Sequence, residues 1–81
     1  MKSYFVYIVR CNDDSLYTGY TRNLKNRIRE HNKSRFGAKS LRGKRPVKLV
    51  YSEEFDNISD ALKKEAEIKK WKKGKKEQLV A

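Results

Sequence analysis

Two β-rich runs separated by a short polar cluster begin this chain, and they constrain its fold more than any other feature. The run YFVYIVR at 4–10 is aromatic and β-branched, and LYTGYT at 16–21 is similar in character. The cluster NDDS at 12–15 has side chains that favour turns. This pattern predicts a β-hairpin.

A first helix is expected directly after the hairpin, over roughly 22–32. Thr21 suits its N-cap, and Leu24 and Ile28 lie one turn apart on an apolar face. The segment that follows, 33–46, carries basic residues and no acid, and its glycines and proline predict a loop.

The second half of the chain predicts one more strand and one long helix. The run VKLVYSEEF at 47–55 has strand character, and Asn57 or Ser59 can cap a helix that extends to about Lys73. Gly74 suits the C-cap of that helix, and the KKEQLVA that follows is expected to add a short terminal helix.

The predicted element order is therefore β-β-α-β-α, with a last α after it. We expect an α+β fold in which a small three-stranded, mostly antiparallel sheet is flanked by helices. A chain of 81 residues is long enough for one core, so 1–81 is interpreted as a single domain.

Net charge limits the partners of this protein. Twenty-one Lys and Arg against ten acids give a net charge of +11, which favours a polyanion through counterion release. Nucleic acid is the first candidate and anionic membrane the second, but the chain has no long apolar run, signal peptide or lipidation motif. We therefore expect a protein of the cytoplasm or a nucleoid-like compartment, without a membrane partner.

The chain has a single cysteine and a single histidine. Cys11 cannot form an internal disulfide and is interpreted as a buried thiol at a strand end. His31 alone leaves too few soft ligands for a structural zinc site, so any metal is expected to bind oxygen.

Polar side chains occupy apolar positions in both predicted helices. On a helical wheel, Arg27 and His31 lie within about 60° of Leu24, on the face shared with Ile28. In the second helix, Glu65 falls in the middle of the apolar stripe. The apolar members of that stripe are Ile58, Ala61, Leu62 and Ile68.

Each of these polar residues also has a purely structural interpretation. Arg27 can extend along the margin of the stripe to water, and His31 can be a half-buried, hydrogen-bonded imidazole. Glu65 can pair with Lys69 one turn later. Three such exceptions on two helices that pack on one small sheet are nevertheless typical of a functional site.

The predicted hairpin offers further polar partners in Tyr7 and Tyr17. Alternatively, both phenols lie in the core with satisfied hydroxyls. Gly19 lies within a strand, where a glycine marks either a bulge or the close approach of a ligand. A four-residue loop would send the two tyrosines to opposite faces, so a shared site predicts a three- or five-residue loop, or a bulge.

An arginine, a histidine, phenols and one carboxylate, without a Ser or Cys nucleophile, suit phosphoryl chemistry. The carboxylate would hold Mg²⁺ or Mn²⁺, and the arginine would neutralise charge on the phosphate. A phenol or imidazole would take the proton from an attacking water. The residues thus point to metal-assisted phosphoryl chemistry.

Over nearly its whole length the sequence resembles the GIY-YIG nuclease superfamily, and in particular its very small stand-alone bacterial members. The segments FVYIVRC, LYTGYT, LKNRIREHN, LVY and ALKKEAEIKKW follow one another in the family order. The two motifs of the superfamily name correspond to Phe5-Val6-Tyr7 and Tyr17-Thr18-Gly19. The resemblance implies a GIY-YIG domain in which Val6 and Gly19 are structural motif positions.

The resemblance also implies roles for the polar residues. Tyr7 would help to activate water, and His31 would assist proton transfer. Arg27 and Tyr17 would bind or polarise the scissile phosphate. Glu65 would anchor Mg²⁺, which stabilises the leaving oxygen.

Two departures from the family pattern bear on activity. Phe5 replaces the first motif glycine, and no asparagine follows Asn57, although several active relatives have one downstream. The resemblance implies an endonuclease that acts on DNA more than on RNA, with branched or damaged DNA in repair or recombination as candidate substrates. Because no recognition domain is appended, a protein partner would supply sequence specificity.

The alternative is a non-catalytic nucleic-acid-binding protein that keeps the nuclease fold, and a small interaction module is a third hypothesis. In the binding protein, Phe36 or Trp71 would stack on bases, although Trp71 is better explained as packing against the terminal LVA. The expected state is a monomer or weak dimer. The basic residues expected to contact nucleic acid are Lys33, Arg35, Lys39, Arg42, Lys44, Arg45, Lys69, Lys72 and Lys73.

Overall fold

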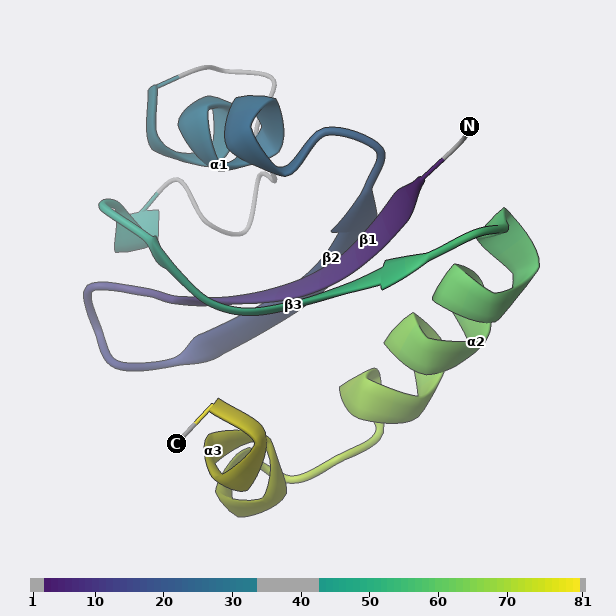
Figure 1. Ribbon diagram of the computed structural model, residues 1–81. Coiled ribbons are helices and arrows are strands. Elements are labelled where there is room, and N and C mark those ends of the chain that lie inside the picture. The colour runs from purple at the N-terminus through teal and green to yellow at the C-terminus, as the bar shows by residue number, and fades with distance from the viewer. Residues whose placement is uncertain (1–2, 34–42, 81) are drawn as a thin grey trace.

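The computed structural model describes residues 3–33 and 43–80 (Figure 1). The described residues form six elements in the order β-β-α-β-α-α, which confirms the predicted α+β class. These elements are β1 (Tyr4–Arg10), β2 (Leu16–Thr21), α1 (Leu24–Lys33), β3 (Lys48–Phe55), α2 (Ile58–Lys69) and α3 (Lys73–Val80).

The strands pair into one antiparallel sheet in the order β2-β1-β3. Because β1 lies between the other two, both of its edges are paired, and its central residues 6–9 are all buried. Figure 1 shows α1 over one face of the sheet, and α2 and α3 over the opposite face.

Successive side chains of β1 point to opposite faces of the sheet and build two apolar clusters. Tyr7 and Val9 face α1, where they pack with Cys11, Val47, Tyr17, Leu24 and Ile28. Val6 and Ile8 face α2, where they pack with Ala61 and Ile68. Cys11 is a buried free thiol, as predicted.

The first helix starts two residues later than the sequence predicts. Thr21 is still part of β2, and its hydroxyl accepts a hydrogen bond from the Asn23 backbone N–H at 3.2 Å. The side chain of Asn23 instead accepts from the N–H of Asn26 at 3.0 Å, which is the bond an N-cap makes. The prediction of Thr21 as the cap is therefore wrong, because that residue still extends the strand.

The second helix has the predicted cap but a different end. Asn57 accepts from the Asp60 N–H at 2.9 Å, so Asn57 rather than Ser59 is the N-cap. The helix ends at Lys69 and not near Lys73. Gly74, expected as its C-cap, lies inside α3.

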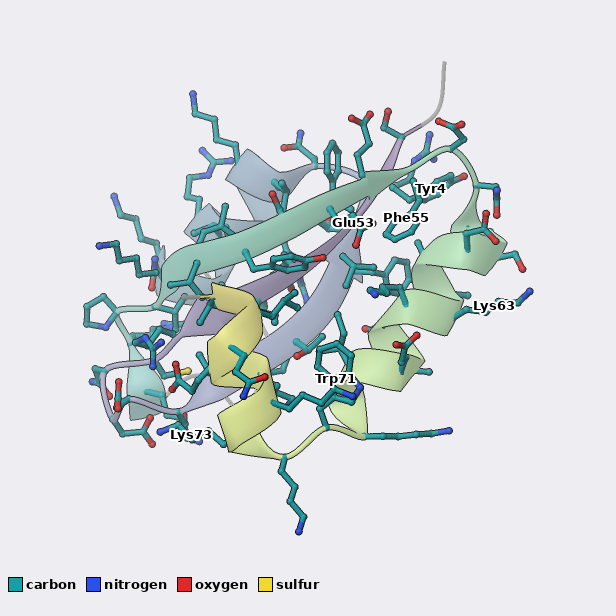
Figure 2. The ribbon with its side chains drawn as sticks, turned by 60° about the horizontal axis from the view of Figure 1, so that its bottom comes forward. Tyr4, Glu53, Phe55, Lys63, Trp71 and Lys73 are labelled. Carbon is teal, nitrogen blue, oxygen red and sulfur yellow. The ribbon has the colours of Figure 1, made fainter. Side chains whose placement is uncertain are left out.

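Packing of Trp71 explains the early end of α2. Its backbone N–H bonds the carbonyl of Ile68 at 3.0 Å, which tightens the last turn. The indole packs against the Val6–Ile8 cluster, and so do Leu79 and Val80 of the terminal segment that the sequence predicted as its partner. Figure 2 shows Trp71 between α2 and α3.

The expected apolar stripe of α2 is only partly buried. Ala61 and Ile68 are fully buried, whereas Ile58 and Leu62 are 43% and 40% exposed. The stripe is narrower than predicted because one small sheet contacts only one side of the helix. No helix within the described ranges is long and apolar enough to span a membrane.

Candidate active site

The hairpin register brings the two motif tyrosines to one face of the sheet. Tyr7 lies opposite Gly19, and Val9 lies opposite Tyr17. The loop between the paired residues therefore spans 11–15, five residues, with Asp14 at a φ of 70°. This is one of the odd-length loops that a shared site requires.

Gly19 makes room for the phenol of Tyr7. A Cβ added at Gly19 would lie 2.6 Å from the Tyr7 hydroxyl oxygen and 2.8 Å from its ring carbon Cζ. The irregularity in the sheet is elsewhere, between Ile8 and Val9 in the pairing of β1 with β3. The glycine is therefore neither a bulge nor an open approach for a ligand, but the space that the Tyr7 ring occupies.

His31 is completely buried between the two tyrosines. Its Nε2 lies 2.7 Å from the Tyr7 hydroxyl oxygen, and its ring meets that of Tyr17 edge-on, with ring centres 5.6 Å apart. The imidazole is thus hydrogen-bonded as the structural interpretation expected, but it is fully buried instead of half-buried.

Burial shifts the pKa values of this pair in opposite directions. Loss of hydration, and then the positive charge of Arg27, lower the pKa of His31 to about 4. Loss of hydration raises the pKa of Tyr7 to about 12, although its interaction with Arg27 opposes this change. At neutral pH the site therefore holds a neutral imidazole and a neutral phenol joined by one hydrogen bond.

Arg27 lies at the margin of this face, with its side chain 30% exposed. Its Nη1 donates to Oε1 of Glu30 at 3.1 Å, and its guanidinium also interacts with the Tyr7 hydroxyl. Burial alone would lower the pKa of Arg27, but these two partners outweigh it and raise the pKa. Arg27 is thus a permanent cation beside the Tyr7 oxygen.

Glu65 approaches the site from the other layer. It lies on α2, which contacts both β1 and β2, and its side chain is only 14% exposed. Its charge is among those that raise the Tyr7 pKa, so its carboxylate lies within electrostatic range of the phenol. Oε2 of Glu65 pairs with the Lys69 ammonium at 3.4 Å, as the structural interpretation expected.

Two residues that the sequence analysis did not assign to this site hold His31 in place. Asn32 donates to the carbonyl of Val47 at 3.0 Å and accepts from its N–H at 2.6 Å. Arg45 Nε donates to the backbone carbonyl of His31 at 2.5 Å. Both contacts fix the C-terminal end of α1, and neither is visible in local sequence because each joins residues at least fourteen positions apart.

The predicted nucleic-acid contacts fall into different surroundings. Arg35, Lys39 and Arg42 lie outside the described residues. Lys33 and Lys72 are exposed. Among the residues that the structure describes, Lys33 and Lys72 form no ion pair with an acid.

Two further basic residues of that set are bound to acids of the loop between β1 and β2. Lys44 pairs with Asp13 at 3.6 Å. Lys73 pairs with Asp14 at 3.6 Å and also with Glu77 at 3.9 Å. These pairs are exposed and contribute little stability. A nucleic-acid phosphate can therefore replace the carboxylates at small cost.

The donor set excludes a metal site of several protein ligands in the described part of the chain. There, no group of three or more His, Cys, Asp and Glu side chains comes together. Glu65 is the acid best placed to bind a single metal ion, since its carboxylate is largely buried and its charge is among those that raise the pKa of Tyr7. One carboxylate fits Mg²⁺, which commonly binds one or two carboxylates and takes its other ligands from water and substrate phosphates.

Comparison with known proteins identifies the fold and its relatives. The family model described as the GIY-YIG catalytic domain matches residues 3–78. The chain belongs to the GIY-YIG family. The tyrosines, the arginine, the histidine and the glutamate described above all lie within the matched range.

Relatives of similar size match nearly all of the chain. A UPF0213 protein of Syntrophus aciditrophicus is 48% identical over 80 residues, which cover 99% of this chain and 92% of that protein. A UPF0213 protein of Haloquadratum walsbyi is 54% identical over 77 residues, with 95% and 85% covered.

Solved structures agree. The solution structure of the UPF0213 protein BH0048 from Bacillus halodurans has a TM-score of 0.63 at 44% identity and covers 96% of this chain and 82% of that one. The protein EF2693 from E. faecalis gives a TM-score of 0.66 at 42% identity, with the same coverage. The resemblance inferred from the motifs is therefore confirmed.

Proposed function

We propose that this protein is a divalent-metal-dependent endonuclease that hydrolyses phosphodiester bonds, in DNA more than in RNA. The observation that carries the proposal is the buried hydrogen bond between Tyr7 and His31, with the Arg27 guanidinium beside the phenol. The family match and the net charge of +11 support it.

Tyr7 and His31 act together as the proton acceptor in this mechanism. A phenol with a pKa of about 12 is not ionised at neutral pH and cannot by itself take a proton from water. Neutral His31 can accept the phenolic proton through Nε2 as the Tyr7 oxygen takes one from the attacking water. His31 would leave this step as an imidazolium, which its burial disfavours, so the step requires the negative charge of a bound phosphate nearby.

Arg27 and Tyr17 bind the phosphate in this proposal. The guanidinium stabilises the negative charge that develops on the phosphate oxygens during attack. Glu30, which pairs with Arg27 at 3.1 Å, must give way to the phosphate. Both side chains of that pair are about 30% exposed, so the exchange requires no opening of the core.

Glu65 would hold Mg²⁺ or Mn²⁺ after releasing Lys69. The bound ion supplies charge stabilisation of the leaving oxygen. The contribution of the protein is a carboxylate held partly out of water, with an ammonium 3.4 Å away that can move to a substrate phosphate. Branched or damaged DNA, in repair or recombination, is the candidate substrate, and the cytoplasm the proposed location.

A cleavage panel tests the proposal. Labelled DNA and RNA single strands, flaps and junctions are incubated with Mg²⁺ or Mn²⁺ and with wild type, Glu65→Ala or Glu67→Ala. Glu67 is a matched control because it is an exposed acid of the same helix. We expect cleavage by wild type and Glu67→Ala, and loss of cleavage with retained binding in Glu65→Ala.

Equal cleavage by all three proteins would contradict the role of Glu65. Binding without cleavage by any of them would favour the second candidate, a nucleic-acid-binding protein that keeps the nuclease fold. The Glu65–Lys69 pair is the observation that favours this candidate, because it gives the carboxylate a purely structural role.

A further inference from the structure

Lysines from two helices gather around the only tryptophan of the chain. We call Lys64, Trp71 and Lys75, together with the exposed Lys72 that directly follows Trp71 in the chain, the lysine corner. The ammonium of Lys75 lies 4.5 Å from the centre of the Trp71 ring, and that of Lys64 lies 5.8 Å from it. Figure 2 shows this ring where α2 and α3 approach each other, so the corner is a joint surface of both helices.

The positive charge of the corner is not balanced within the protein. Among the residues that the structure describes, Lys64, Lys72 and Lys75 form no ion pair. Contact with the indole face attracts the two ammonium groups. It also holds two like charges close to one ring, where they repel each other.

Helix stability does not explain these charges. In α2, Asp60 lies in the first turn and Lys69 in the last, as the helix dipole favours. In α3, lysines occupy the first turn and no acid does, which is the unfavourable arrangement. An anion bound at this turn would neutralise the lysine charges and would interact favourably with the positive end of the α3 dipole.

The corner shares α2 with Glu65, because Lys64 directly precedes that residue in the helix. Lys69 lies one helical turn, about 5.4 Å, beyond Glu65. Lys73, at the other side of the turn, pairs with Asp14 in the loop between β1 and β2 at 3.6 Å. The start of α3 is thus near the hairpin end of the sheet.

We propose that the lysine corner binds the backbone phosphates of a segment of nucleic acid adjacent to the segment held at Glu65. The proposal rests on the proposed function only in taking the polyanion to be the substrate. The contacts are ionic and independent of sequence, made by Lys64, Lys72 and Lys75. Trp71 senses the segment because the ammonium groups over its ring turn to the phosphates.

The intrinsic fluorescence of Trp71 tests this inference directly, since it is the only tryptophan. The full-length protein is titrated with a short oligothymidylate in EDTA at several salt concentrations. We expect a saturable change in emission. In Lys64→Gln/Lys75→Gln, the slope of log K against log salt should fall by about 1.4, the value for two lost contacts with a single strand.

Lys63→Gln is the matched control. Lys63 is the sequence neighbour of Lys64 and equally a lysine of α2, but Figure 2 shows it pointing away from Trp71. Its salt slope should stay within about 0.3 of wild type. Far-UV circular dichroism of each variant, and the single variant Lys75→Gln with an expected slope change of about 0.7, keep loss of folding apart from loss of contacts.

Three results would overturn the inference. One is an unchanged Trp71 emission while a labelled strand reports binding. Another is an equal salt slope in wild type and the double variant. The third is a response to vesicles containing phosphatidylglycerol without a response to the oligonucleotide, which would make the corner a membrane surface. The titration contains no metal and measures no cleavage. It therefore tests phosphate binding at the lysine corner even if the protein proves not to be a nuclease.

Discussion

The two faces of the sheet are closed by different chemistry, although the same strand supplies both. On the α2 face, Val6 and Ile8 pack on Ala61 and Ile68, and all four are completely buried. On the α1 face, neighbouring positions of β1 pack Tyr7 against His31 through a 2.7 Å hydrogen bond.

This difference indicates that burying β1 does not by itself require a polar pair such as Tyr7 and His31. On the α2 face the centre of β1 is covered by Ala61 and Ile68, with aromatic rings packed around them, so the fold buries this side of the strand without an imidazole. His31 is buried where its charged form is strongly disfavoured, and perturbed pKa values of this kind cluster at functional sites. We therefore attribute the polarity of the α1 face to the proposed chemistry, and the apolar packing of Ala61 and Ile68 on the α2 face to stability.

Ile68→Ala should have the largest effect on stability and a small one on the site. Removing a fully buried isoleucine leaves a cavity in the α2 face and costs about 3 kcal/mol of unfolding free energy. The midpoint temperature of thermal unfolding should fall by roughly 12–24 °C. Cleavage by the folded variant should continue at the wild-type rate. Loss of cleavage at temperatures below the unfolding transition would show that packing on the α2 face also controls the site on the α1 face.

Acid should weaken the α1 face in particular. The native pKa of His31 is about 4, below its ordinary 6.5, so the unfolded chain takes up a proton first as the pH falls. The free energy of unfolding should therefore decrease between pH 6.5 and 4, by about 3 kcal/mol from this residue. Urea unfolding at several pH values measures the loss.

The variant His31→Gln isolates this contribution, because the carboxylates titrate in both proteins. Its unfolding free energy should fall less than that of wild type over the same pH range. Parallel curves for the two proteins would mean that His31 does not resist protonation in the native state.

Two glycines should respond in opposite ways to the same change. Gly19→Ala brings a Cβ to 2.6 Å from the Tyr7 oxygen and should cost about 1–3 kcal/mol, with a shifted Tyr7 and reduced cleavage. Gly74→Ala meets nothing within 4 Å in helix α3 and should add about 0.5–1 kcal/mol. Thermal unfolding of both variants tests this. A stabilised Gly19→Ala would show that Tyr7 can occupy another position.

Local pattern predicted much of the fold because the signals are local. The β-branched runs give β1 and β2 at the expected bounds, and Asn57 caps α2 as expected. The break after Lys69 was missed because nothing in a run of lysines marks it. It depends on Trp71 packing against side chains far away in the sequence.

The sequence predicted the residues of the candidate site but not the residues that hold them in position. The helical wheel and the family motifs singled out Arg27, His31 and Glu65, and the structure places the first two in contact with Tyr7. Glu65 lies on α2, where its partner is Lys69. The pairing of Asn32 with Val47 could not be predicted, because its two hydrogen bonds depend on the tertiary path of the chain. Roles in catalysis stay predictions until cleavage is measured.

The most direct test of the account is the single-turnover cleavage rate of Tyr7→Phe under the metal conditions of the panel. Tyr51→Phe is the control, since the Tyr51 hydroxyl donates to the exposed Glu53 at 2.6 Å and its ring packs with the Val6–Ile8 cluster, on the face of the sheet away from His31. The account predicts a rate at least about 100-fold lower for Tyr7→Phe. It also predicts an unchanged rate for Tyr51→Phe. Cleavage by Tyr7→Phe at the wild-type rate would contradict the proton transfer through Tyr7 and His31.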